Sequence, residues 1–154
     1  MNTAVHNKLV SFIWSIADDC LRDVYVRGKY RDVILPMVVL RRLDALLEPT
    51  KDAVMEELAF QRDEVQLTEW DENGLRQASG FVFYNISEWT LQRLQNTATN
   101  SQQLLLANFE DYLNGFSPNV KEIVEKFNLR SQVKHMAAKD VLLNVLEKFT
   151  LPLS

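Results

Sequence analysis

The sequence has 154 residues, enough for one domain with its own hydrophobic core. Its 47% hydrophobic and 25% charged residues exclude a largely disordered chain. Four glycines and four prolines are fewer turn residues than an all-β sandwich or a glycine-rich nucleotide-binding domain needs. The single cysteine, Cys20, excludes a disulfide framework and a multi-cysteine metal site, and it favours a cytoplasmic location. We expect no membrane span, because no apolar run approaches roughly 18 residues, and no signal peptide, because no basic stretch followed by an apolar one opens the chain.

The charged residues are unevenly distributed along the chain. Residues 1–50 hold seven basic and six acidic residues, and residues 115–154 hold six basic and four acidic ones. Between them, residues 51–114 hold four basic and eleven acidic residues. This middle part would repel phosphate groups, so we expect any contact with nucleic acid to come from the two ends.

The chain opens with an amphipathic pattern over residues 4–22, which Thr3 can cap. Its apolar residues recur three and four positions apart and therefore share one helix face: Val5, Leu9, Phe12, Ile13, Ile16 and Cys20. Residues 23–28 contain Gly28 and predict a short connection to the next helix.

Residues 29–48 predict a central helix that is apolar nearly all round and therefore buried. Its apolar run consists of Val33, Ile34, Leu35, Met37, Val38, Val39 and Leu40. Pro36 should kink this helix unless it falls in the first turn. Arg41 and Arg42 lie toward the end at which the helix dipole favours cations.

After Pro49 the helical spacing of apolar residues becomes less regular. Residues 50–61 predict an amphipathic helix with Val54, Leu58 and Phe60 toward the core. The polar residues 62–80 predict a long connection with a single helical turn. Residues 81–84 are expected to form a very short extended segment, which has too few partners to make a sheet.

Short helices follow to the end of the chain. We expect Ser87 to cap a helix over 88–96, and Gly115 to close a helix over 101–114 in the left-handed conformation. Ser117 should cap a helix over 118–127 that starts at Pro118 and buries one face, consisting of Val120, Ile123, Val124 and Phe127. A last helix over about 139–149 should bury Val141, Leu142, Val145, Leu146 and Phe149. The predicted fold is therefore an all-α, single compact multi-helix domain.

No catalytic constellation emerges from the spacing of reactive residues. The glycines form no phosphate-binding loop, and His6 and His135 are far apart, so we expect His135 on the surface or at a helix end. Asp18 and Asp19 are expected to be solvated, or one of them to pair with Arg22. On its apolar stripe, Cys20 should be a buried structural thiol and not a nucleophile.

Two groups of basic residues remain as candidates for DNA binding. Arg22, Arg27, Lys29 and Arg31 surround the predicted turn, and Lys126, Arg130 and Lys134 repeat every four residues. Either these residues form an ordinary solvated surface, or they contact the phosphates of DNA.

Four segments in order resemble the start of the methyltransferase (M) subunit of type I restriction–modification systems. That family opens with a helix whose pattern this chain matches at Trp14, Ala17, Asp18, Leu21 and Arg22. A Tyr-led apolar helix ending in basic residues and Asp follows, here 30–44. Segments 81–94 and 114–127 resemble the same N-terminal region in one branch of the family. The resemblance covers essentially the whole chain, and the order of the segments makes it more specific than any one of them.

The catalytic motifs of this family are missing from the chain. Such M subunits bind S-adenosylmethionine through a Gly-rich loop and act on a flipped adenine through an Asn-Pro-Pro-Phe-like tetrapeptide, but the prolines here, Pro36, Pro49, Pro118 and Pro152, are isolated. We therefore expect residues 1–154 to be the helical N-terminal domain, either excised or split from the rest. It should hold no catalytic residue and bind no cofactor, whereas the intact subunit would use S-adenosylmethionine to methylate adenine.

The resemblance implies partners as well as a fold. They are double-stranded DNA, the specificity subunit, a second methyltransferase subunit and the restriction subunit, with no membrane. One hypothesis is that this domain clamps DNA and helps subunits assemble. The alternative is a protein–protein interaction module that docks on the catalytic domain or specificity subunit without contacting DNA. A stand-alone enzyme is nearly excluded, because the chain should not bind S-adenosylmethionine.

Overall fold

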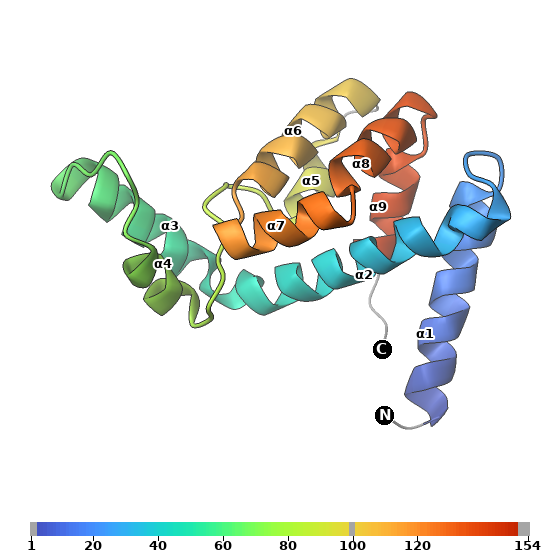
Figure 1. The fold of residues 1–154 in the computed structure, drawn as a ribbon, viewed down its shortest axis with the longest axis horizontal. Coiled ribbons are helices and arrows are strands. Elements are labelled where there is room, and N and C mark those ends of the chain that lie inside the picture. The colour runs from blue at the N-terminus through green and yellow to red at the C-terminus, as the bar shows by residue number, and fades with distance from the viewer. Residues whose placement is uncertain (1–2, 99–100, 151–154) are drawn as a thin grey trace.

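The described residues, 3–98 and 101–150, form helices and no strand in the computed structural model, in which the side chains of residues 15–18 and Arg27 are not described (Figure 1). The α-helices are α1 Thr3–Ile16, α2 Tyr30–Leu47, α3 Lys51–Ala59, α4 Glu72–Ser79, α5 Leu91–Thr97, α6 Gln102–Asn114, α7 Pro118–Lys126, α8 Leu129–Ala138 and α9 Leu142–Thr150. The short 3-10 and π turns are η1 Ala17–Leu21, η2 Arg27–Lys29, η3 Glu48–Thr50 and η4 Phe60–Glu64. The predicted all-α class is confirmed.

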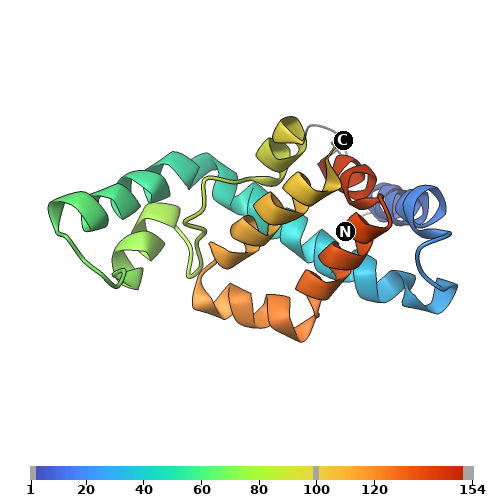
Figure 2. The same cartoon turned by 90° about the horizontal axis from the view of Figure 1, so that it is seen from above.

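The main core lies where α2 passes α6, α8 and α9 (Figures 1 and 2). Its most deeply buried side chains include Met37, Leu40, Leu94, Phe109, Tyr112, Leu113, Val133 and Leu146. The last predicted helix is confirmed as α9, which buries Leu142, Val145, Leu146 and Phe149. Helix α8 was not predicted, although its buried residues keep helical spacing: Leu129, Val133, Met136 and Ala137.

A second, smaller core belongs to α3 and α4, which project from one end of the molecule (Figure 1). It consists of Val54, Leu58, Leu75 and Tyr84, with Trp70 packed against it. We call this projection, residues 51–79, the arm. Because α2, η3 and α3 follow one another without a loop, the arm continues from the end of the central helix.

The central helix is less buried than its composition predicts. Leu35 and Val39 are 44% and 40% exposed, since the other helices cover only one side of α2. Pro36 lies in the second turn of α2, beyond the first turn, and is buried. On α7, Val120 and Val124 are buried, whereas the expected burial of Ile123 and Phe127 is wrong.

The polar segment between α3 and Phe81 is more ordered than predicted. It contains the two-turn helix α4 in place of a single turn. Asp71 caps this helix by accepting from the backbone N–H of Asn73 at 3.1 Å, and Gly80 closes it with φ 82°. The expected burial of Phe60 is wrong: its side chain is 52% exposed on the outside of the arm.

Two predicted helix ends are also corrected. Thr90, not Ser87, caps α5, and its hydroxyl accepts from the N–H of Arg93 at 3.1 Å. Gly115 is right-handed, with φ −78°, and not left-handed. A Cβ atom there would lie 2.7 Å from both Asn85 Oδ1 and the backbone nitrogen of Ser87. Glycine is therefore required at this position by close packing and not by backbone conformation.

The segment after α4 touches α6 and α7 through one isolated β-bridge. This bridge pairs Asn85 with Phe116, so the extended contact lies just beyond the predicted 81–84. Ser117 precedes α7 as expected, but its hydroxyl accepts from the N–H of Tyr84 at 3.2 Å and donates to Asn119 Oδ1 at 2.6 Å. Ser117 therefore occupies the N-cap position without a side-chain cap bond, and Asn119, inside the first turn, accepts from the N–H of Val120 at 3.0 Å through its Oδ1.

Replacing Ser117 with alanine should lower the free energy of unfolding by about 1 kcal/mol, because the buried N–H of Tyr84 loses its acceptor. Urea unfolding measures this change. Replacing the exposed Ser131 of α8 with alanine is the matched control and should have no measurable effect. Equal stability of the two variants would contradict a structural role for the Ser117 hydroxyl.

Candidate functional site

The turn between α1 and α2 is fixed against α8. The Tyr25 hydroxyl donates to Gln132 Oε1 at 2.8 Å, and its ring packs edge-on against His135 with centroids 4.9 Å apart. Nε2 of His135 lies 3.3 Å from the carbonyl oxygen of Val24. Burial raises the pKa of Tyr25 to about 12, so the hydroxyl keeps its proton at neutral pH. The turn therefore has a defined position, and His135 is part of its support in the last turn of α8.

Around this turn the first group of basic residues faces solvent. Arg22, Lys29 and Arg31 are exposed, and the side chain of Arg27 lies outside the described atoms. Lys29 Nζ is 3.9 Å from Asp32, an exposed pair that contributes little to stability. These side chains are accessible to a ligand, and their role as phosphate contacts stays a prediction.

The second group of basic residues lies along α7 and α8. Lys126 ends α7 and pairs with Glu122 at 4.0 Å. Arg130 is half-buried, and Lys134 is exposed and lines a shallow depression of about 470 Å³ beside the first turn of α6. Gln132, two residues before Lys134, faces the turn, and two residues place side chains about 160° apart around a helix. The two groups therefore do not merge into one patch at Lys134.

Other titratable residues have structural roles. Asp19 is exposed, which agrees with its predicted solvation, and its carboxylate pairs with Lys148 of α9 at 3.0 Å, a partner that spacing did not predict. Cys20 is buried as predicted, and burial raises the pKa of its thiol, which disfavours the reactive thiolate.

A buried polar cluster, which spacing did not predict, joins the arm to the main body. We call Asp44, Lys51, Asn85 and Tyr112 the joint. Lys51 Nζ donates to the carbonyl oxygen and to Oδ1 of Asn85, both at 3.4 Å, and the Tyr112 hydroxyl donates to Asp44 Oδ1 at 2.8 Å. Burial lowers the pKa of Lys51 to about 8 and raises that of Asp44. The joint connects α2, α3 and α6 with the segment before α5, and so sets the direction of the arm.

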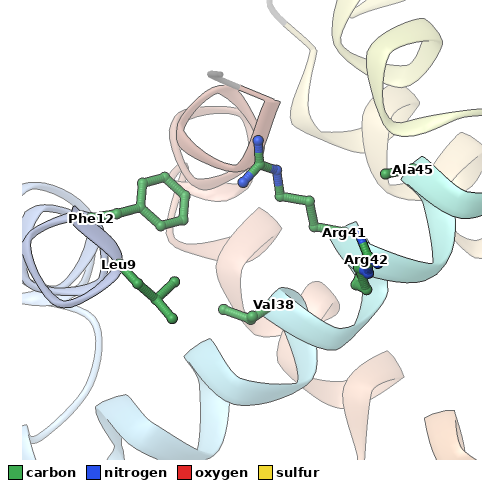
Figure 3. Close-up of a pocket in the computed structure, with 6 residues that line it drawn as sticks. All are labelled: Leu9, Phe12, Val38, Arg41, Arg42 and Ala45. Carbon is green, nitrogen blue, oxygen red and sulfur yellow. The ribbon is translucent and has the colours of Figure 1, made fainter. Parts of the chain in front are cut away.

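A depression of about 300 Å³ lies between α1 and α2 (Figure 3). Its lining consists of the apolar residues Leu9, Phe12, Val38 and Ala45 and of the basic residues Arg41 and Arg42. The guanidinium carbon of Arg41 lies 5.7 Å from the centre of the Phe12 ring, a cation–π contact between the two helices. We call this depression the α1–α2 groove.

The groove lacks a group that S-adenosylmethionine sites need. The ribose hydroxyls of that molecule call for a carboxylate of the kind that nucleotide-binding folds supply. No acidic side chain lines the groove. In the part of the chain that the structure describes, no cluster of His, Cys, Asp and Glu could hold a metal ion, and no helix is long and apolar enough to cross a membrane.

Comparison with known proteins identifies a family. The family model described as the HsdM N-terminal domain matches residues 9–149, nearly the whole chain. No curated protein and no solved structure matches the chain. The matched range runs from the middle of α1 to the last turn of α9 and so contains the turn, the joint and the groove. The chain therefore belongs to the family of HsdM N-terminal domains, the N-terminal domains of the M subunits of type I restriction–modification systems.

Proposed function

We propose that this domain clamps double-stranded DNA and helps to assemble an adenine-specific DNA methyltransferase in the cytoplasm. Methyl transfer from S-adenosylmethionine would take place in another domain of the M subunit. The partners would be the specificity subunit, a second M subunit and the restriction subunit. The observation that carries the DNA proposal is the turn fixed on α8, which presents Arg22, Lys29 and Arg31 to solvent.

A clamp is useful to this chemistry for a physical reason. An adenine must leave the base stack before its amino group can be methylated, at a cost of a few kcal/mol. Phosphate contacts hold the complex together during that step without reading sequence, so specificity would belong to the other subunit. The acidic arm lies at the opposite end of the molecule from the turn, which supports a defined orientation on DNA (Figure 1).

Reversing the charge of Arg22, Lys29 and Arg31 to glutamate in the intact M subunit should weaken DNA binding. Each lost phosphate contact should make the dependence of log K on log salt shallower by about 1, so the triple variant should lose about 2 to 3 from its slope. Fluorescence anisotropy over a range of salt concentrations measures this slope. The control is Arg62→Glu, an equally exposed reversal on the arm, which should leave the slope unchanged.

An unchanged slope in the triple variant would overturn the DNA proposal. It would favour the second candidate, a module that contacts only protein, for which the structure offers a specific surface. Val39 of α2, Ile123 of α7 and Phe127 just after α7 are exposed and line one shallow depression. Exposed apolar side chains grouped in this way are typical of protein contacts.

A further inference from the structure

The α1–α2 groove combines two properties that favour a particular ligand. Leu9, Phe12 and Val38 give it apolar walls, and Arg41 and Arg42 add positive charge at one side (Figure 3). Arg42 is exposed, and no carboxylate among the described residues forms an ion pair with it. Such a groove suits a helix that presents an apolar side chain flanked by carboxylates.

The arm of this same chain presents such a helix face. Asp52, Glu56, Phe60 and Glu64 recur every four residues along α3 and η4, and all four are exposed. We call these residues the acidic stripe. Phe60 is its only aromatic member, and its side chain is 52% exposed and therefore accessible to a partner.

The groove and the acidic stripe of one chain cannot meet. At about 1.5 Å per residue, the helices from Arg42 to Phe60 rise roughly 27 Å, with no loop that would let them fold back. Arg42 and Ala45 of the groove and all four residues of the stripe are exposed, at different distances along these consecutive helices.

We propose that the acidic stripe of one copy docks into the α1–α2 groove of a second copy, and that the second copy does the same in return. Phe60 would enter between Leu9, Phe12 and Val38, with Glu56 near Arg42. This contact would be one of the surfaces through which the domain helps subunits to assemble. It rests on that part of the proposed function and does not depend on DNA binding.

A second copy fits better than another partner for two reasons. The charges are complementary, because the arm belongs to the acidic middle of the sequence and the groove to a more basic part. Two antiparallel copies can also make both contacts around one two-fold axis, which closes the assembly and prevents filaments. Since each contact is shallow, we expect a weak dimer with a dissociation constant of roughly 10 to 500 μM.

The test is the self-association of the 154-residue chain without DNA, measured by sedimentation equilibrium at low salt. The wild type should form dimers in the expected range, and raising the salt should weaken them. Arg42→Glu and Glu56→Arg should each raise the dissociation constant at least about tenfold, because a like-charge pair replaces an attractive one. The double variant carrying both substitutions should recover dimers to within about threefold of the wild type.

Matched controls are Lys139→Glu and Glu125→Arg, exposed charge reversals on α7 and beyond α8 that should leave the dimer unchanged. Phe60→Ser, which alters only an exposed side chain, should weaken the dimer independently of charge, and circular dichroism checks that every variant is folded. A monomeric wild type, or single variants Arg42→Glu and Glu56→Arg that behave like the controls, would overturn the proposed contact. Failure of the DNA proposal is separate, because it concerns only the salt slope of the Arg22, Lys29 and Arg31 variant.

Discussion

Replacing Gly115 with alanine should lower the free energy of unfolding by about 2–3 kcal/mol. The new Cβ would lie 2.7 Å from Asn85 Oδ1, 2.7 Å from the backbone nitrogen of Ser87 and 2.8 Å from its Cβ. Asn85 cannot move away cheaply, because its amide donates to the Tyr112 carbonyl oxygen at 2.9 Å and its Oδ1 accepts from Ser87. The substitution should therefore disturb both the end of α6 and the joint.

Gly28 offers the matched control for this prediction. A Cβ at Gly28 meets no atom within 4 Å, and its φ is not positive. Gly28→Ala should therefore be neutral, or stabilising by about 0.5 kcal/mol through a less flexible unfolded chain. Urea unfolding of both variants measures the difference. If Gly115→Ala were as stable as Gly28→Ala, the close packing of α6 against the segment before α5 would be wrong.

Helical periodicity correctly predicted the helices that bury a single apolar face against their neighbours. The residues expected inside that belong to α9 are buried, whereas Val141, just before α9, is only partly buried. Helix α6 ends where Gly115 suggested. Periodicity cannot say which side of an apolar helix remains uncovered. For this reason it placed Leu35 and Phe60 in the core, although the packing of distant helices leaves them in solvent.

In the candidate sites too, the sequence predicted groups of residues that are close in the chain and missed groups that folding brings together. Local sequence identified Arg22, Lys29 and Arg31 as a group, because they are close in the chain. It could not identify the groove, which is formed by residues 9–12 and 38–45 on two helices, or the joint, in which Asn85 and Tyr112 are distant in sequence from Asp44 and Lys51. The pairing of Asp19 with Lys148 was equally invisible, since 129 positions separate them in sequence.

The joint makes stability depend on pH in a direction that can be stated in advance. Burial lowers the pKa of Lys51 to about 8 in the folded protein, against 10.5 for an unperturbed lysine. Below about pH 8 both states carry the charge, and the folded state bears the cost of burying it. Between about pH 8 and 10.5 the unfolded chain binds more protons than the folded one, so stability rises with pH across this window.

Comparison with Lys51→Met isolates this effect, because methionine has a similar length and no charge. As the pH increases from about 7 to about 10, the wild type should gain about 2 kcal/mol relative to Lys51→Met, after allowing for partial solvent screening of the amine. Urea unfolding of both proteins at several pH values gives this difference in stability. The contributions of the titratable groups that the two proteins share cancel in it. The matched control is Lys139→Met, the same substitution at an exposed lysine. A flat difference between wild type and Lys51→Met would mean that water reaches the Lys51 amine, and that the arm is not held to the body by a buried charge.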